Sequence, residues 1–170
     1  MAVLPLATLP DPMVRTRAKR VRDIDDSVRR LVQDMIDTMR AAHGVGLAAV
    51  QIGVPLRVAV IEIPEEDQVR ILINPQVLER QGERELEEGC LSIPGYRGQV
   101  KRSFKVKVKA LDLQGKEVRI KVEDNLLAQA LEHEMDHLNG VLYIDHLVSK
   151  DSLWKLEEEE TTESRLKSGP

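Results

Sequence analysis

Apolar residues recur at helical spacing in the segment from Asp25 to Ala42. They occupy positions i, i+3, i+4, i+7, i+8 and i+11, which are Val28, Leu31, Val32, Met35, Ile36 and Met39. This spacing places all six side chains on one face of an α-helix. Either Asp25 or Asp26 can cap the first turn, and Gly44 follows the last apolar position. The pattern predicts an amphipathic helix over residues 25–42.

Four later segments have the composition or the alternation of β-strands. Residues 56–63 and 69–74 are rich in Val, Ile and Leu. Residues 104–111 and 117–123 alternate apolar and charged side chains and flank the sequence DLQGK. Such alternation is typical of strands with one buried face, and a glycine-containing turn between two of them predicts a hairpin. Because these strands follow one another without an intervening helix, we expect antiparallel pairing.

A second helix is predicted between Asp124 or Asn125, as its cap, and Asn139, with Gly140 as its stop. One face would present Leu126, Gln129, Ala130, His133 and His137, and another would present Leu127, Leu131, Met135 and Leu138. Because both faces are suited to burial, we expect this helix to be central. The predicted fold class is α+β, with antiparallel β-sheets packed around the second helix.

The chain has 170 residues, a length suited to one domain. No repeat or composition shift divides it before the last segment, so we expect a single catalytic domain over residues 1–150. Residues 151–170 form an acidic C-terminal tail that begins like a helix and continues as polar sequence. We expect this tail to be part helical or disordered.

Composition narrows the classes of partner. The net charge is −4 and the chain has only two tyrosines, one tryptophan and one phenylalanine, so neither DNA binding nor an extended base-stacking surface is expected. The N-terminus lacks a basic segment before its short apolar stretch, and no apolar run is long enough to span a bilayer. With a single cysteine, Cys90, no intrachain disulfide can form. We expect a cytoplasmic protein without a membrane partner.

The sequence HEMDH, residues 133–137, has metal-binding spacing. His133 and His137 lie four residues apart, so both imidazoles project from one side of a helix and can bind one ion. Glu134 lies beside them, where a carboxylate can act on a metal-bound water. A short motif of this kind also occurs by chance in charged helices, so a third ligand is needed to support the assignment.

Several residues are candidates for that third ligand. Peptidases that extend the motif to HxxGxxH use a third histidine, but Tyr143 occupies that position here. His146 lies beyond Gly140 and would have to fold back, and Glu157 belongs to a run of four glutamates typical of a solvated surface. Cys90, in EEGCLSIPG, is either a ligand or a small buried apolar residue. The residues alone leave this choice open.

Three stretches taken together resemble the signature blocks of the peptide deformylase family. These are GVGLAAVQ at 44–51, EGCLS at 88–92 and HEMDH at 133–137, followed by Gly140. The blocks occur in the family's order, and the resemblance extends from about residue 5 to residue 148. It implies a peptide deformylase-like fold and a hydrolase that removes the N-formyl group from the formyl-methionine of newly made polypeptides, releasing formate.

The resemblance also implies roles for individual residues. Cys90, His133 and His137 would be the metal ligands, and Glu134 the general base. Gln51 and the backbone N–H of residue 91 (Leu91) would hold the developing oxyanion. The implied physiological ion is Fe²⁺, for which Zn²⁺, Ni²⁺ or Co²⁺ can substitute, since a thiolate with two imidazoles suits all of these metals.

Substrate recognition is expected beside the metal. Four residues can offer backbone groups to an extended peptide: Gly44, Val45, Gly46 and Gly89. The candidate walls of a pocket for the methionine side chain are Val45, Leu126, Gln129 and Ala130, for which core packing is the alternative role. Glu88, Asp136 and Arg102 are candidates to orient the imidazoles, although surface ion pairing is the alternative for Arg102.

The chain departs from the family pattern at Glu132, where many members have glutamine, so an extra negative charge lies near the metal unless it is paired. The implied partners are nascent N-formyl-methionyl peptides, with a transient ribosome contact. The acidic tail lacks the cations that phosphate binding requires. It is therefore poorly suited to RNA.

Two other functions remain compatible with the motifs. A zinc peptidase could use the same helix with a glutamate or histidine as third ligand. A noncatalytic domain could close the metal site with Cys90, both histidines of the motif and His146, in which case removing the metal should unfold it. Glu134 and Gln51 favour a catalytic site over this second alternative.

Overall fold

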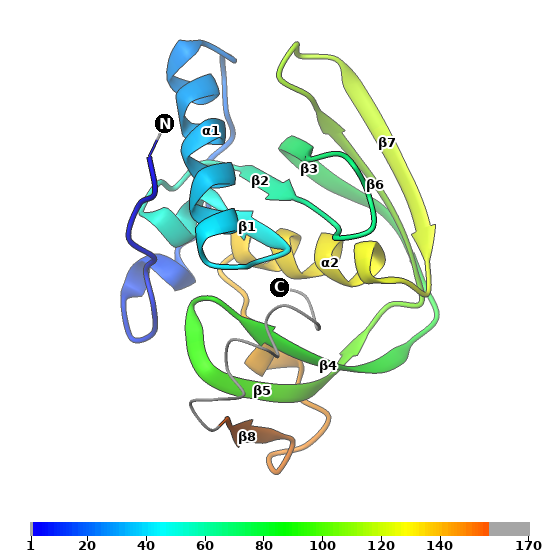
Figure 1. Ribbon diagram of the computed structural model, residues 1–170. Coiled ribbons are helices and arrows are strands. Elements are labelled where there is room, and N and C mark those ends of the chain that lie inside the picture. The colour runs from blue at the N-terminus through cyan, green and yellow to red at the C-terminus, as the bar shows by residue number, and fades with distance from the viewer. Residues whose placement is uncertain (1, 157–170) are drawn as a thin grey trace.

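Two antiparallel sheets lie on either side of one helix in the computed structural model, which describes residues 2–156 (Figure 1). The five-stranded sheet has the order β1-β2-β3-β6-β7. Its strands are Gly46–Ala48, Val58–Ile61, Arg70–Gln81, Lys105–Leu111 and Glu117–Glu123. The three-stranded sheet has the order β4-β5-β8, with strands Arg84–Cys90, Ile93–Arg102 and Leu153–Lys155. Helices α1, Asp26–Ala41, and α2, Leu126–Leu138, and three short 3-10 turns, Pro12–Arg15, Ala49–Ile52 and Tyr143–His146, complete the described fold.

Helix α1 forms where the apolar periodicity predicts it. The side chain of Asp25 accepts a hydrogen bond from the Val28 N–H and caps the first turn. The helix ends one residue earlier than predicted, and its last turn is followed by His43 with φ = 57° rather than by Gly44 in the left-handed region. A non-glycine residue there is uncommon. Gly44 lies just past the helix end, as predicted, but His43 is the residue that adopts the left-handed conformation there.

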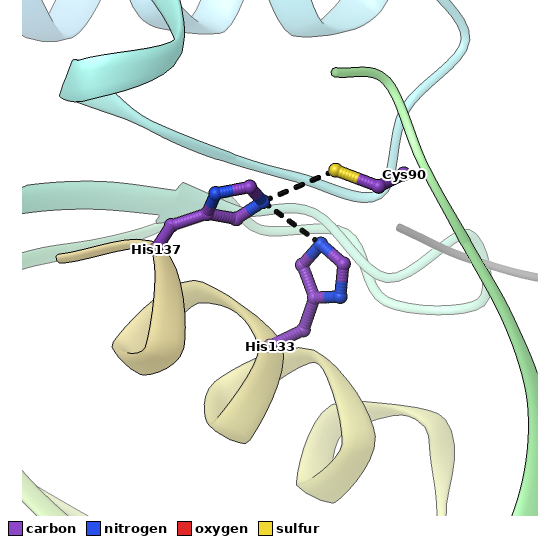
Figure 2. A group of neighbouring side chains, drawn as sticks. All are labelled: Cys90, His133 and His137. Carbon is purple, nitrogen blue, oxygen red and sulfur yellow. Dashed lines mark hydrogen bonds between the residues drawn. The ribbon is translucent and has the colours of Figure 1, made fainter. Parts of the chain in front are cut away.

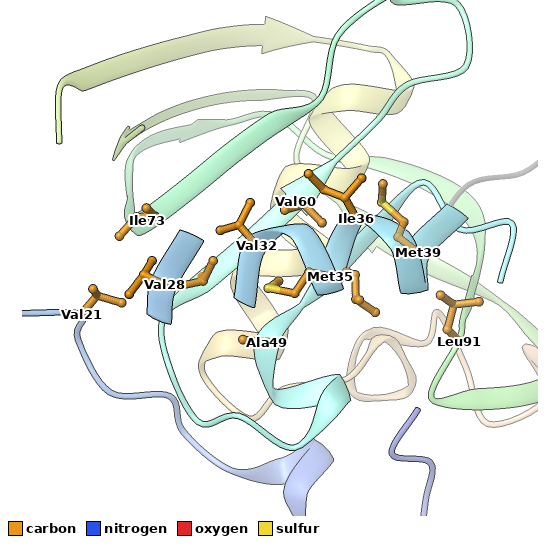
Figure 3. Close-up of a cluster of buried hydrophobic side chains, with 12 residues drawn as sticks. Val21, Val28, Val32, Met35, Ile36, Met39, Ala49, Val60, Ile73 and Leu91 are labelled. Atoms are coloured by element: carbon orange, nitrogen blue, oxygen red, sulfur yellow. The ribbon is translucent and has the colours of Figure 1, made fainter. Parts of the chain in front are cut away.

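Strand β2 is buried on both faces because the two helices cover it from opposite sides. Val58 and Val60 belong to the apolar cluster that includes the buried face of α1 (Figure 3). Ala59 and Ile61 belong to a second cluster that includes residues of α2. Neighbouring side chains of a strand point to opposite faces, so each face of β2 packs against a different helix. This explains why residues 56–63 contain an uninterrupted apolar run.

Helix α2 is central, as predicted. Asn125 caps it by accepting a hydrogen bond from the Ala128 N–H. Leu127, Ala128, Ala130 and Leu131 pack against the five-stranded sheet, and the Gln129 side chain donates a hydrogen bond to the backbone oxygen of Glu87 on β4. The predicted α+β class with antiparallel sheets around this helix is confirmed. No helix within residues 2–156 is long and apolar enough to cross a bilayer.

Four strands were not predicted from the sequence. β4 and β5 form a hairpin whose sequence is dominated by charged residues, glycine and proline, and β1 has only three residues. β8 corrects a prediction directly, because Leu153–Lys155 pairs with β5 as a strand where the tail was expected to begin as a helix. A free edge of β5 accounts for this, since it offers backbone partners to an adjacent segment. Residues 157–170 of the predicted tail lie outside the described residues.

Substitutions at two consecutive residues of β3 test whether both faces of the five-stranded sheet are tightly packed against a helix. Leu72 packs in the cluster of α2, and Ile73 in the cluster of α1. Replacing either by alanine should lower the free energy of unfolding by about 2–5 kcal/mol, as measured by urea titration. Leu78→Ala on the same strand, where the side chain is 38% exposed, should cost about 0.5 kcal/mol. A near-zero cost at Leu72 or Ile73 would show that one face of the sheet is not tightly packed.

Candidate metal centre

Cys90, His133 and His137 converge on one buried point, although β4 and α2 are far apart in sequence (Figure 2). The Cys90 Sγ lies 3.2 Å from the His137 Nε2, and that nitrogen lies 3.1 Å from the His133 Nε2. All three ligand atoms lie within 4.8 Å of one another. Ligands on a tetrahedral ion with Zn–S and Zn–N bond lengths would be separated by about 3.3–3.6 Å. The donor set therefore fits a metal ion.

A backbone N–H and a side-chain amide lie close to the Cys90 sulfur. Cys90 is the last residue of β4, and the turn to β5 places the Ser92 N–H 3.4 Å from the Cys90 Sγ. The Gln51 Nε2 lies 3.8 Å from the same sulfur and donates a hydrogen bond of 3.0 Å to the Ser92 hydroxyl. The sulfur is therefore held between the turn after β4 and the Gln51 amide.

The orientation of His133 is fixed by a buried carboxylate. Its Nδ1 donates to the Glu88 Oε2 over 2.7 Å, which leaves Nε2 directed at the other ligands. Ligating histidines commonly use their second nitrogen in this way. Burial alone lowers the pKa of His133, but the charge of Glu88 holds it well above its ordinary value.

Arg102 completes this arrangement from inside the protein. Its guanidinium donates to both oxygens of Glu88 and, through Nη1, to Asp136 over 2.6 Å. The Arg102 side chain is only 2% exposed, so the alternative of a surface ion pair was wrong. Burial opposes ionisation of Glu88, yet the facing charges of His133 and Arg102 hold the pKa of Glu88 well below its usual range. Glu88 is consequently ionised and able to orient His133.

His146 lies outside the cluster of ligand atoms. Its Nε2 is 3.0 Å from the Asp136 Oδ2, the oxygen that also accepts from Arg102, and the side chain is 37% exposed. Tyr143, at the position of a third histidine in HxxGxxH peptidases, is buried near Cys90 with its hydroxyl unpaired within the described residues. Neither residue joins the donor set that the described residues form, and Glu157 lies outside them.

His137 and Glu134 have buried polar atoms that no other described residue contacts through a hydrogen bond. Within the described residues, the His137 Nδ1 and both carboxylate oxygens of Glu134 make no hydrogen bond. Burial lowers the pKa of His137 well below its ordinary value, so the imidazole is neutral and available to a metal. Burial raises the pKa of Glu134 to about 7. Buried polar groups are normally paired, so unpaired oxygens beside a donor cluster indicate a site for chemistry.

Gly46 has no side chain, and the Glu134 carboxylate occupies the space that a side chain there would fill. A Cβ atom at Gly46 would overlap the Glu134 carboxylate, so only glycine allows β1 to approach this close. A Cβ at Gly44 would lie 2.8 Å from the Leu91 side chain, and one at Gly89 would lie 2.8 Å from the Arg97 guanidinium. All three glycines therefore lie at points of close approach around the cluster.

Gln51 is held by both ends of its amide. Its Oε1 accepts a hydrogen bond of 2.9 Å from the Ala48 N–H, so the NH₂ group faces Cys90 and Ser92. Leu91 follows Cys90 in the turn, and its side chain packs into the cluster of α1. The sequence reasoning missed Ser92, although a hydroxyl two residues after a ligand cysteine was visible within the EGCLS block.

The remaining predicted binding residues divide into two groups. Val45 and Ala130 are buried in one apolar cluster, against which Leu126 is partly buried. Gln129 points elsewhere, because its Nε2 donates to the Glu87 backbone oxygen and to the Glu88 Oε1, each over 3.1 Å. Gln129 therefore supports the carboxylate that orients His133.

The extra carboxylate of Glu132 is paired. It accepts hydrogen bonds from the Ser103 N–H over 2.6 Å and from the Arg80 Nε over 3.1 Å. These contacts direct Glu132 away from the ligand atoms of His133, toward β3 and the segment after β5. The added charge is thus compensated locally.

Comparisons with known proteins agree with this geometry. The family model described as polypeptide deformylase matches residues 3–152. A peptide deformylase of Dehalococcoides mccartyi is 48% identical over 92% of this chain and 93% of its own, and one of Thermomicrobium roseum is 48% identical over 96% and 98%. The crystal structure of a peptide deformylase from Legionella pneumophila superposes with a TM-score of 0.84 at 43% identity, covering 97% of this chain and 94% of the other.

Family model, relatives and structure thus agree over nearly the whole described chain. The chain belongs to the polypeptide deformylase family, metal-dependent hydrolases that remove the N-formyl group from new polypeptides.

Proposed function

We propose that this protein deformylates N-formyl-methionyl peptides with a metal ion held by Cys90, His133 and His137, and that Glu134 moves the proton. The observation that supports this most strongly is the convergence of three metal-ligating atoms beside a buried carboxylate that has no hydrogen-bond partner within residues 2–156. Three protein ligands leave a position open for water, as in catalytic rather than structural sites.

The roles of the chain's own groups follow from their positions. A bound ion would supply Lewis-acid chemistry, lowering the pKa of water and polarising the formyl oxygen. Glu134 accepts the proton of the attacking water and returns it to the departing amine, so that formate and a free N-terminus are released. The Gln51 NH₂ and the Leu91 N–H lie on the Cys90 side, and they would donate to the oxygen on which negative charge develops.

The pKa of Glu134 suits this work. A group that takes up and returns a proton is most effective when its pKa is near the working pH. Burial raises the pKa of Glu134 to about 7, so the carboxylate and the carboxylic acid are both accessible at neutral pH.

Substrate binding is proposed along the start of β1 and the two residues before it. Gly44 is partly buried, Val45 and Gly46 are buried, and Gly46 lies against Glu134, while Gly89 precedes Cys90 on β4. An extended peptide between them would take backbone hydrogen bonds as an added strand does. Val45, Ala130 and Leu126 would then contact the methionine side chain, whereas Gln129 would act through Glu88.

We further propose Fe²⁺ as the resident ion, with Zn²⁺, Ni²⁺ or Co²⁺ as substitutes. A thiolate and two imidazoles can bind each of these metals. The ligands therefore indicate a transition metal of this group but do not identify the element. The proposed substrates are nascent chains in the cytoplasm, where the protein would contact ribosomes transiently.

One experiment tests both the activity and the metal. Apoprotein is reconstituted separately with Fe²⁺ and Zn²⁺ without oxygen, and formate release from formyl-methionyl peptide is measured before and after exposure to air. The Fe²⁺ form should be faster and should lose activity in air, because oxygen that enters the open ligand position can oxidise Fe²⁺ and its ligand thiolate. Cys90→Ala, prepared in parallel, should retain neither metal nor activity. Equal rates and lifetimes for both ions would reject iron, and absence of formate with either ion would reject the reaction.

Glu134→Gln should keep its metal but lose about 10²- to 10⁴-fold in turnover, because an amide cannot transfer the proton. Metal content and formate release are measured on the same preparation. Glu132→Gln is the matched control: it makes the same change on the same helix, and its amide oxygen can still accept from Ser103. The control should retain its rate, and a near-normal rate in Glu134→Gln would remove this residue from the mechanism.

A further inference from the structure

A short segment of this acidic protein is strongly basic. Residues 15–22, RTRAKRVR, contain five cations and no acidic residue, in a chain whose net charge is −4. Arg15 is paired with Asp145. The other four, Arg17, Lys19, Arg20 and Arg22, are all exposed and are called the basic strip below. The proposed reaction uses none of them.

The backbone of the basic strip is held on both sides. The Ala18 N–H donates to the Leu138 oxygen at the end of α2, and the Lys19 N–H donates to the Pro55 oxygen. The Val21 N–H and C=O are both hydrogen bonded to the side chain of Asn74. Because Ala18 and Val21 are buried, the cationic side chains between them are directed outward from a fixed chain. The strip is therefore an ordered surface.

The cations of the strip are not neutralised locally. Within residues 2–156, none of the four makes an ion pair or a side-chain hydrogen bond, although Asp23 and Asp25 lie nearby. Asp25 is engaged in capping α1. Arg57, outside this segment, adds another cation beside the strip, where its guanidinium donates to the Leu138 oxygen. Burial, together with the charge of Arg17, lowers the pKa of Arg57. Like charges gathered without partners favour an anionic ligand.

The chemistry of the strip favours the phosphate backbone of folded RNA over other anionic surfaces. Three of its four residues are arginines, whose planar forks suit phosphate oxygens. The large apolar side chains exposed in the described chain, Val3, Leu78, Tyr96, Phe104 and Trp154, all lie outside it. The strip thus lacks the apolar anchors of a membrane-binding surface and the rings that stack on single-stranded bases. Lys19, Arg20 and Arg22 also line a hollow of about 850 Å³, together with Asp23, Asp25 and apolar residues.

We propose that Arg17, Lys19, Arg20 and Arg22 form a docking surface for the phosphate backbone of folded RNA. The choice of RNA over an acidic protein rests on the proposed function, because substrates that are nascent chains are presented on RNA-rich particles. Contact at the strip would hold the enzyme through the end of α2, the helix that also bears His133 and His137. The described part of the C-terminal tail contributes no comparable cluster.

Binding is tested with holoenzyme and a fluorescent RNA hairpin with a stem of about 16 base pairs, by fluorescence anisotropy between about 50 and 200 mM salt. Four phosphate contacts predict a slope of log K against log salt of about −3 to −4, and therefore about 100-fold weaker binding at the higher salt. The variant R17Q/K19Q/R20Q/R22Q should bind at least about tenfold more weakly at low salt, with a slope near zero. The matched control K107Q/K109Q/K116Q/K121Q makes the same charge change on the β6–β7 hairpin and should bind like the wild type.

Three results would overturn the proposal: no RNA binding by the wild type, equal loss in the control variant, or displacement of RNA by polyglutamate at equal charge concentration. Formate release from free formyl-methionyl peptide is measured on the same samples, with thermal unfolding as the check on folding. The strip variant should keep this activity. A wild type that binds RNA through the strip but releases no formate would reject the proposed reaction and leave the docking surface standing.

Discussion

The candidate site depends on one buried ion pair, between Arg102 and Glu88. Removing two charges from water is costly, and such a pair persists only when its remaining donors and acceptors are satisfied. Here Glu88 accepts from Arg102, Gln129 and His133, while Arg102 also donates to Asp136. Through His133 the pair fixes one imidazole, and through Asp136 it contacts the last turn of the helix that bears both histidines. The ion pair thus sets the geometry of one ligand directly.

The fold brings this pair and the third ligand together by packing α2 between two sheets. Its apolar residues fill the inner face of the five-stranded sheet, so the polar face of the same helix must meet β4. Cys90 arrives at the end of β4, and Gly46 admits the Glu134 carboxylate beside β1. Glu134 is thus placed by α2, Gln51 by a short 3-10 helix and Leu91 by the turn directly after β4, which favours a preorganised site.

Much of this could be predicted from the sequence, because helical periodicity, the HEMDH spacing and the β6–β7 alternation are local patterns. The spacing of the motif left the third metal ligand open, and the family resemblance identified it as Cys90. The burial of Arg102 could not be predicted. An arginine in this sequence is expected at the surface unless β5 is known to face α2. For the same reason Gln129 was taken for a pocket wall. The sequence did not predict β4, β5 and β8, because these strands depend on tertiary contacts that a polar or glycine-containing sequence does not indicate.

The claim that the Arg102–Glu88 pair organises the metal centre is tested most directly by the Zn²⁺ affinity of Glu88→Gln. This change keeps the shape of the side chain and removes its charge, and Glu87→Gln makes the same change one residue away on the exposed face of β4. Competition with a chelator, on protein shown to be folded by circular dichroism, gives both dissociation constants. We expect Glu88→Gln to bind Zn²⁺ about 10- to 100-fold more weakly and Glu87→Gln to bind it as the wild type does. Equal affinity in the two variants would show that the ion pair does not organise the metal centre.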